Sequence, residues 1–121
     1  MPKCALNTQK GAVNRFMYMD KVFGIRRNSD VILQNSNLSF DSSLWQLLWP
    51  LLSGCKIVIP RRKSYIDIDY TLQLIAKHRV TMTDFVPSVF NLLLYKLEGN
   101  PGLMEMLASK VVRRIQPKQY W

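Results

Sequence analysis

Two acidic side chains stand out in the sequence by their positions. Asp41 follows Phe40 at the point where a strand is expected to give way to a helix, and Asp84 interrupts the apolar run from Val80 to Val86. Asp41 can either cap its own helix or face a ligand, and its position alone favours the cap. Asp84 is the more informative acid, because a carboxylate within an apolar strand needs a partner to offset its loss of hydration.

Metal and thiol chemistry have few candidates. The sequence contains two cysteines, Cys4 and Cys55, and one histidine, His78. The cysteine spacing matches no zinc or redox motif, and a single histidine leaves a metal site short of ligands. We therefore expect no metal site, and we expect a reducing cytoplasm as the compartment.

No segment of the sequence predicts a membrane protein. The N-terminus has no apolar signal core. The most apolar stretch, Leu44 to Leu52, is too short to cross a bilayer and is interrupted by Gln46 and Pro50. The protein is expected to be soluble, or part of something soluble.

Length and composition predict one compact globular domain. The chain has 121 residues, of which 48% are hydrophobic and 21% charged. Lys and Arg number 17 against 8 Asp and Glu, a net charge of +9 that favours acidic partners, from nucleotide phosphates to nucleic acid. The basic residues fall in small groups, at 26–27, 61–63 and 110–118, without the interleaved aromatic residues of a single-strand-binding groove. Solvated faces are therefore the favoured interpretation of the charge.

The elements that must position the two acids begin with a helix and a strand. A helix is expected from Lys10 to Phe23, after the cap Asn7-Thr8. Its apolar residues stand at mostly helical spacings: Val13, Phe16, Met17 and Phe23. Val31 to Gln34 fits a short buried strand, and Asn35 to Ser39 is rich in turn residues.

Asp41 precedes a helix that is expected from Ser42 to about Leu52. Five leucines share one broad face of this helix: Leu44, Leu47, Leu48, Leu51 and Leu52. Pro50 should bend or end the last turn, and Gly54 closes the helix. Lys56 to Pro60 then fits a second buried strand.

The alternation continues along the chain. Helices are expected from Asp67 to His78, from Pro87 onward and near Leu103 to Ser109, with strands at Val80 to Val86 and Val111 to Ile115. Strands that alternate with helices imply parallel βαβ units. The expected fold class is therefore α/β, a layered and mostly parallel sheet with helices on both faces. In such sheets ligands bind beyond the carboxyl ends of the strands.

Three segments resemble the adenylation domains of nonribosomal peptide synthetases. Ser39-Phe40-Asp41-Ser42-Ser43-Leu44-Trp45, continuing to Gly54, closely resembles the FDxS region of these domains. Upstream, Pro2 to Arg15 is similar to the end of the family's phosphate loop and the helix after it. Downstream, Val80 to Ser88 is similar to a strand and turn that form another wall of the amino-acid pocket. The three similarities occur in the family's order and extend over roughly Pro2 to Ile115, which implies part of the N-terminal domain of an adenylate-forming enzyme.

The resemblance implies roles for particular residues. The Asp of the FDxS region holds the α-ammonium group of the amino acid, so Asp41 inherits that role, and a buried carboxylate would offset much of the ammonium's desolvation cost. Phe40 is similar to an aromatic gate beside the nucleotide and acyl site. Ser42, Trp45 and Asp84 fall where the family lines the side-chain pocket, although packing in the core is an alternative, compatible role for Trp45. Asp84 then indicates a polar or cationic amino-acid side chain.

The resemblance also implies ATP and Mg²⁺ as cofactors of the parent family, with Lys3 approaching the phosphates as a point charge. The Gly/Ser/Thr-rich part of the phosphate loop would precede Pro2, and the family's adenine, ribose and catalytic-lysine motifs have no counterpart after Ile115. We therefore divide the chain into a partial adenylation subdomain, 1–115, and a divergent tail, 116–121. The parent activity would be ATP-dependent activation of an amino acid as aminoacyl-AMP. This chain alone is expected to be inactive and to bind neither cofactor tightly.

Two other classes of function stay open. A non-catalytic α/β interaction module would pack against the remainder of a synthetase or against itself, through an unpaired sheet edge and apolar faces. A nucleic-acid binder would rest on net charge alone. The first predicts self-association in light scattering, and the second predicts DNA binding that weakens steeply with salt.

Overall fold

The computed structural model describes residues 3–61, 67–110 and 114–117. Its strands are β1 (Val31–Leu33), β2 (Lys56–Val58), β3 (Met82–Phe85) and β4 (Arg114–Pro117). They form one parallel sheet in the order β2-β1-β3-β4. Ile32 of β1 pairs with Ile57 on one side and with Met82 on the other, so β1 and β3 are the central strands. The predicted parallel α/β sheet is confirmed.

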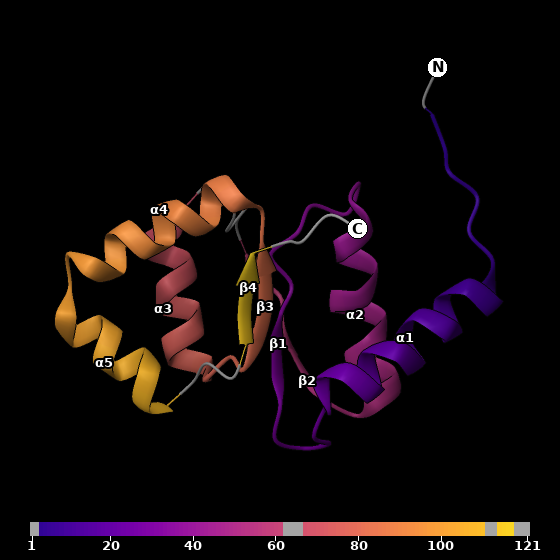
Figure 1. Ribbon diagram of the computed structural model, residues 1–121, viewed down its shortest axis with the longest axis horizontal. Helices are drawn as coiled ribbons and strands as arrows, with labels where there is room; N and C mark the ends of the chain where they lie inside the picture. Colours follow the sequence, from indigo (N-terminus) through magenta and orange to yellow (C-terminus); the bar gives the residue numbers. More distant parts are fainter. Residues whose placement is uncertain (1–2, 62–66, 111–113, 118–121) are drawn as a thin grey trace.

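Helices cover both faces of this sheet (Figure 1). One face carries α1 (Gln9–Phe23) and α2 (Asp41–Ser53), and the other carries α3 (Ile68–His78), α4 (Pro87–Glu98) and α5 (Pro101–Lys110).

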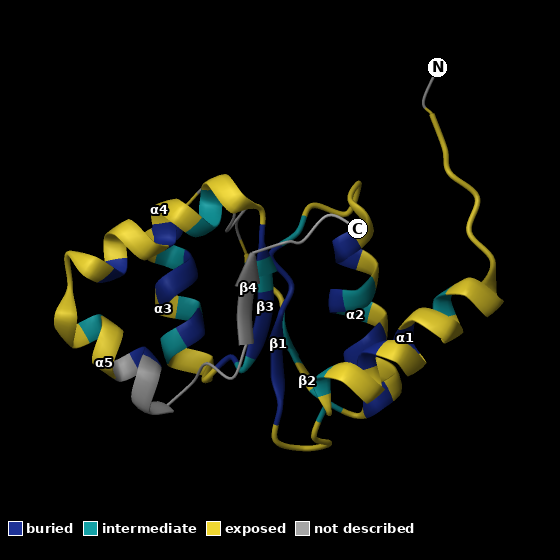
Figure 2. Ribbon diagram, viewed as in Figure 1, coloured by how far each residue is buried: buried dark blue, intermediate teal, exposed yellow. Residues whose placement is uncertain are grey.

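Successive side chains of a strand point to opposite faces, and β1 therefore serves two hydrophobic clusters. Val31 and Leu33 pack with residues of α3, α4 and α5, whereas Ile32 packs with residues of α1 and α2. Figure 2 shows the central strands buried between the two helical layers. The core therefore lies on both sides of β1 and β3.

The helices begin at local signals that the sequence predicts. Thr8 caps α1 by accepting a hydrogen bond from the N–H of Gly11 at 3.1 Å. Asp67 caps α3 by accepting one from the N–H of Tyr70 at 2.9 Å. Pro87 is the first residue of α4, where a backbone N–H would have no helical partner in any case.

In α2, the buried face differs from the leucine face. The inward residues are mostly polar or aromatic: Ser42, Ser43, Gln46, Trp49, Pro50 and Ser53. Four of the five leucines are exposed, and Leu51 and Leu52 are the most exposed at 67% and 66%. Pro50 does not end the helix, which continues to Ser53 and closes at Gly54 with a left-handed φ of 68°.

Three further details correct the expectations. Val13 and Met17 of α1 are exposed, and Phe16 and Met19 are the buried residues of that helix. β2 is only partly buried, because it lies at the edge of the sheet and has a neighbouring strand on one side. β4 includes two residues of the predicted tail, 116–117, while 111–113 of the predicted strand lie outside the described residues.

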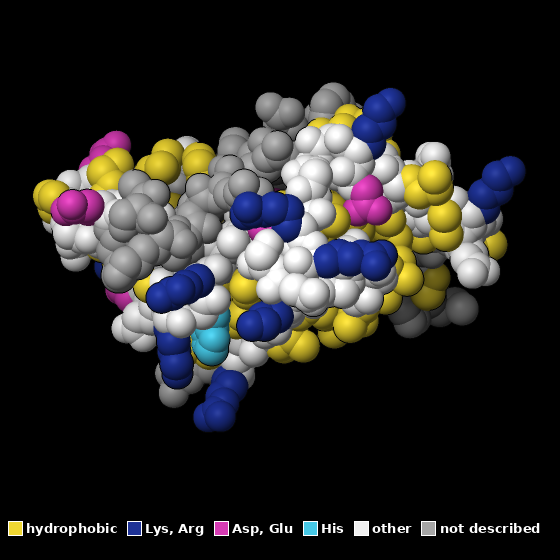
Figure 3. All heavy atoms as spheres, turned by 90° about the horizontal axis from the view of Figure 1, so that it is seen from below, with side chains coloured by type: hydrophobic (Ala, Val, Ile, Leu, Met, Phe, Trp, Pro, Cys, Tyr) yellow, Lys and Arg dark blue, Asp and Glu magenta, His cyan; other side chains and the backbone are white. Residues whose placement is uncertain are grey.

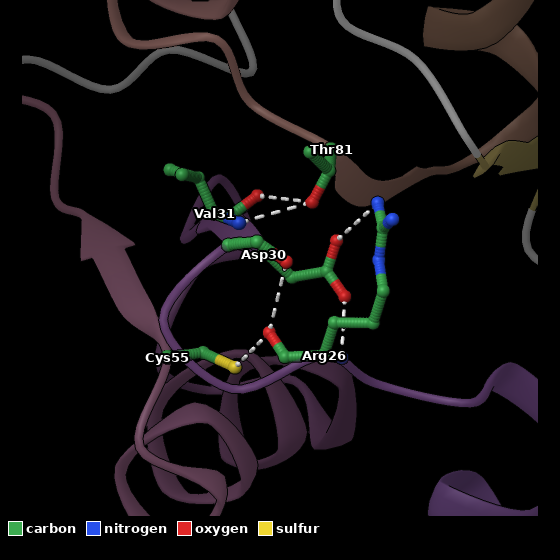
Figure 4. A network of polar contacts seen from close by, with 6 residues as sticks. Arg26, Asp30, Val31, Cys55 and Thr81 are labelled. Atoms are coloured by element: carbon green, nitrogen blue, oxygen red, sulfur yellow. Dashed lines mark hydrogen bonds and ion pairs between the residues drawn. The ribbon is translucent and has the colours of Figure 1, made fainter.

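A network of polar contacts joins the amino end of β1 to the segment before it and to the residues before β2 and β3 (Figure 4). Asp30 is fully buried, and its Oδ2 accepts a hydrogen bond from the N–H of Arg26 at 2.6 Å. The Thr81 hydroxyl accepts one from the N–H of Val31 at 3.0 Å, and the Cys55 thiol donates to the carbonyl of Arg26 at 3.5 Å. Burial, followed by the nearby carboxylate of Asp30, raises the pKa of the Cys55 thiol.

The same end of the molecule carries exposed basic side chains (Figure 3). They include Arg26 and Arg27 before β1, Lys56 at the start of β2, and Lys77 and Arg79 before β3. Lys77 lies in the last turn of α3, where a positive charge interacts favourably with the helix dipole. Within the described part of the chain, no helix is long and apolar enough to span a membrane.

Candidate functional site

The path of the chain singles out one point at the carboxyl ends of the strands. From β1 the chain passes through α2 to β2 on one side, and it then passes through α3 to β3 on the other side of β1. Parallel sheets bind their ligands where such a reversal of strand order occurs. The residues after β1 and at the end of β3 are therefore the candidate site.

A polar cluster with Gln46 at its centre occupies this point. Gln46 of α2 is fully buried, and its Oε1 accepts hydrogen bonds from the backbone N–H groups of Asn35 and Ser36 at 3.1 and 3.0 Å. Its Nε2 donates to the Oδ1 of Asn35 at 2.9 Å and to the Oδ1 of Asp84. The Thr83 hydroxyl also donates to the Oδ1 of Asn35, at 3.1 Å. These bonds tie the loop after β1 to α2 and β3.

Asp84 has the partner that its place in β3 requires. Its side chain is half-buried and accepts a hydrogen bond from Gln46, and its backbone carbonyl accepts one from the side chain of Asn35 at 2.9 Å. The expectation that this carboxylate needs a partner is confirmed. A partly desolvated carboxylate in such a place can bind a cation or another hydrogen-bond donor.

Asp41 is the first residue of α2 and does not occupy its cap position. The N-cap is Phe40, which makes no side-chain cap bond and is 61% exposed. The Oδ1 of Asp41 accepts a hydrogen bond from the N–H of Ser42 at 2.8 Å. The negative charge of Asp41 in the first turn also interacts favourably with the helix dipole. The Asp41 side chain is exposed, so the expectation of a buried carboxylate was wrong for this chain.

Ser42 and Trp45 follow Asp41 in α2, the first directly and the second one helical turn later. Ser42 is buried on the inner face, one turn before Gln46. Trp45 is half-buried, packs against the cluster of α1 and α2, and lies edge-on to Trp49 with ring centroids 5.9 Å apart. Core packing therefore accounts for the position of Trp45, and its role in a side-chain pocket stays a prediction.

Lys3, the candidate phosphate-binding residue, lies apart from the two candidate acids. Lys3 is exposed in the segment before Thr8, which leads away from the sheet in Figure 1. The structure therefore does not bring Lys3 together with Asp41 or Asp84. Nor does the described part of the chain contain a group of three or more His, Cys, Asp or Glu side chains that could hold a metal ion.

Sequence reasoning misses Gln46 and Asn35. It treats Gln46 only as an interruption of an apolar stretch and Asn35 only as a turn residue. The available signal is spacing, because Gln46 stands one helical turn after Ser42 in the segment that resembles the pocket region. A buried amide has four hydrogen-bonding positions to satisfy, so such a residue is expected to organise its surroundings.

Comparisons with known proteins place the chain in a family. The family model described as AMP-binding enzyme matches residues 1–115. Vanchrobactin synthetase VabF of Vibrio anguillarum is 34% identical over 98 residues, which cover 81% of this chain and 3% of the relative. Enterobactin synthase component F of Escherichia coli is 34% identical over 88 residues, which cover 73% of this chain and 7% of the relative.

Solved structures of the nonribosomal peptide synthetase FmoA3 have a similar fold. Its form bound to α-methyl-L-serine-AMP matches with a TM-score of 0.68 and 28% identity, over 74% of this chain and 10% of that chain. Its AMPPNP-bound form matches with a TM-score of 0.63 and 29% identity, over 72% and 9%. This chain thus spans a tenth or less of the length of these relatives.

The sequence and structural evidence agree. The strand order and the carboxylates at the switch point suit a ligand-binding α/β sheet, and the relatives are peptide synthetases. The family model covers nearly all of the sequence. The chain therefore belongs to the AMP-binding enzyme family, and within it corresponds to part of an adenylation domain of the nonribosomal peptide synthetase kind.

Proposed function

We propose that this chain supplies part of the amino-acid pocket of an adenylation domain, whose complete form activates an amino acid with ATP as aminoacyl-AMP. The observation that carries the proposal is the hydrogen bond between Gln46 and Asp84. It places a carboxylate of β3 beside the helix whose first turn carries Asp41, at the point where parallel sheets bind ligands. The related synthetase FmoA3 binds α-methyl-L-serine-AMP, which supports an aminoacyl adenylate as the ligand class of the complete domain.

Each candidate residue has a role in this proposal. Asp41 holds the α-ammonium group of the amino acid through a charge-assisted hydrogen bond. Because Asp41 is exposed here, the rest of the domain would provide the burial that strengthens this bond. Ser42, Trp45 and Asp84 line the side-chain pocket, where Asp84 favours a polar or cationic side chain, and Phe40 is the gate beside the acyl group.

The phosphate chemistry belongs to the complete domain. Lys3 would approach the ATP phosphates, and Mg²⁺ would neutralise part of their charge when bound. In this proposal the chain alone is inactive, because its candidate phosphate-binding residue, Lys3, is exposed and lies apart from Asp41 and Asp84. The division into a subdomain, 1–115, and a tail, 116–121, and the cytoplasmic location are part of the same proposal.

Amino-acid binding by the chain tests the proposal. Titration with L-serine, L-lysine or L-leucine, followed by nuclear magnetic resonance, should shift the signals of Asp41, Ser42 and Asp84. The dissociation constants should be about 1–10 mM, because a partial pocket makes few contacts. Asp41→Asn should abolish the shifts, and propionate, which has no amine, is the control ligand. The proposal fails if no amino acid shifts these signals.

A second candidate function, a non-catalytic interaction module, is favoured by the outward leucines of α2. Leu51 and Leu52 are about as exposed as Ile59, and Met17 of the neighbouring α1 is 67% exposed. Exposed apolar surface of this kind is typical of protein interfaces. In this alternative the leucine face packs against the remainder of a synthetase or against a second copy of the chain.

A further inference from the structure

We propose that Gln46 is a positioning residue, which fixes the direction of the Asp84 carboxylate and thereby the side-chain preference of the amino-acid pocket. The inference rests on the proposed function, in which Asp84 lines that pocket. Gln46 is fully buried and half-buried Asp84 accepts its hydrogen bond, so Gln46 acts on a ligand through Asp84.

The amide of Gln46 has one favourable orientation. Its Oε1 accepts hydrogen bonds from the backbone N–H groups of Asn35 and Ser36, which can only donate. Its Nε2 must therefore face the other way, toward the acceptor oxygens of Asn35 and Asp84. A flipped amide would turn its N–H groups toward two backbone donors, and in a buried place that loss is large. One oxygen of Asp84 is consequently held at a defined point.

A carboxylate held in this way can discriminate between ligands. An amino acid whose side chain carries a donor gains a charge-assisted hydrogen bond from Asp84. An apolar side chain would instead remove water from the carboxylate without replacing the lost hydrogen bonds. Binding sites that hydrogen-bond a ligand reject analogues that lack the hydrogen-bonding group. If the carboxylate could turn freely, part of this discrimination would be lost to the ordering of Asp84 on binding. Gln46 should therefore affect the preference among side chains more than the binding of the α-ammonium group.

The first test is a double-mutant cycle on the stability of the 121-residue chain. Gln46→Met and Asp84→Ala should each raise the unfolding equilibrium constant by some factor. If the two side chains interact, the double variant should raise this constant by a factor about tenfold smaller than the product of the two single factors. Gln73→Met is the matched control, because Gln73 is exposed on α3 and its effect should multiply with that of Asp84→Ala. Multiplicative effects of Gln46→Met and Asp84→Ala would overturn the proposal.

The second test measures the preference among ligands. In the unchanged chain L-lysine should bind about tenfold more tightly than L-leucine. In Gln46→Met this ratio should fall to about threefold, because the Asp84 charge remains but is no longer held in one direction. The dissociation constant of L-leucine should stay within about twofold, because Asp41 is intact. Gln46→Glu serves as a second variant if Gln46→Met does not fold, since it keeps an acceptor oxygen for both backbone N–H groups. With Gln46→Glu the ratio is measured for L-serine against L-alanine, because the added charge would itself attract lysine.

The outcomes separate the two proposals. A ratio that persists in the folded Gln46 variants would reduce Gln46 to a structural role and overturn this inference alone. Failure of the unchanged chain to bind any amino acid would overturn the proposed function and the pocket preference with it.

Discussion

The indole N–H of Trp49 donates a hydrogen bond of 2.7 Å to the Oδ1 of Asp20, and so joins the two helices on one face of the sheet. Trp49 is 1% exposed, and the rings of Phe23 and Trp45 lie against it with centroids 6.2 and 5.9 Å away. The buried residues of α1 are Phe16 and Met19. Because α1 has so few buried side chains, its packing depends strongly on the Trp49 ring and on the hydrogen bond between the Trp49 indole N–H and Asp20.

Asp20→Ala should lower the free energy of unfolding by about 1–3 kcal/mol, because it leaves the buried indole N–H of Trp49 without its acceptor. The matched control is Asp69→Ala, which breaks an ion pair with Lys96 at 2.9 Å between two exposed side chains. That loss should stay below about 1 kcal/mol. Urea unfolding measures both, and equal losses would show that the bond between Asp20 and Trp49 is not important for stability.

Leu51→Glu combined with Leu52→Glu should reduce self-association of the chain without lowering its stability by more than about 0.5 kcal/mol, because both leucines are exposed. Light scattering over a range of protein concentrations measures the association. The control is Leu33→Ala, which removes a fully buried side chain and should lower the free energy of unfolding by about 2–5 kcal/mol. Unchanged association in the double variant would exclude the leucine face as the contact.

Cys55 should react with iodoacetamide several-fold more slowly than Cys4 at neutral pH. Its thiol is partly buried and its pKa is raised, first by burial and then by Asp30, so less of it is thiolate. The reaction of Cys55 should speed up as the pH rises toward this higher pKa. Cys4→Ser should leave only the slow phase, as followed by mass spectrometry, and a fast phase in that variant would contradict the assignment.

The same shift sets the sign of a pH effect on stability. At alkaline pH the unfolded chain, with the ordinary thiol pKa, releases the Cys55 proton first, while the folded chain retains it. The free energy of unfolding should therefore fall as the pH rises through and above the ordinary thiol range. Cys55→Ser should remove this part of the pH dependence, and Cys4→Ser should not.

ATP–pyrophosphate exchange by the purified chain should stay at background with any amino acid. The reason is that Lys3, the candidate group for the charge that develops on the reacting phosphate, is exposed and lies apart from Asp41 and Asp84. The positive control is a complete adenylation domain assayed in parallel. Exchange above background that is lost in Asp41→Asn would overturn the proposal that the chain is inactive alone.

Much of this fold can be predicted from the sequence because its signals are local. Thr8, Asp67, Pro87 and Gly54 mark helix ends through the chemistry of the adjacent backbone. The alternation of strands and helices was sufficient to predict a parallel sheet, since short connections and right-handed crossovers leave few other arrangements. Asp84 also stands out in the sequence, because a carboxylate in an apolar strand requires an explanation.

The sequence alone therefore determined the order of the elements, the sheet and the segment that carries the candidate site. Only the tertiary structure decided which face of α2 is buried, that Asp41 is exposed, and that Gln46 holds Asp84. Helical periodicity shows which residues share a face, but the neighbouring elements determine whether that face is covered. Gln46 and Asp84 are 38 positions apart, so their contact arises only when α2 packs beside the carboxyl ends of β1 and β3.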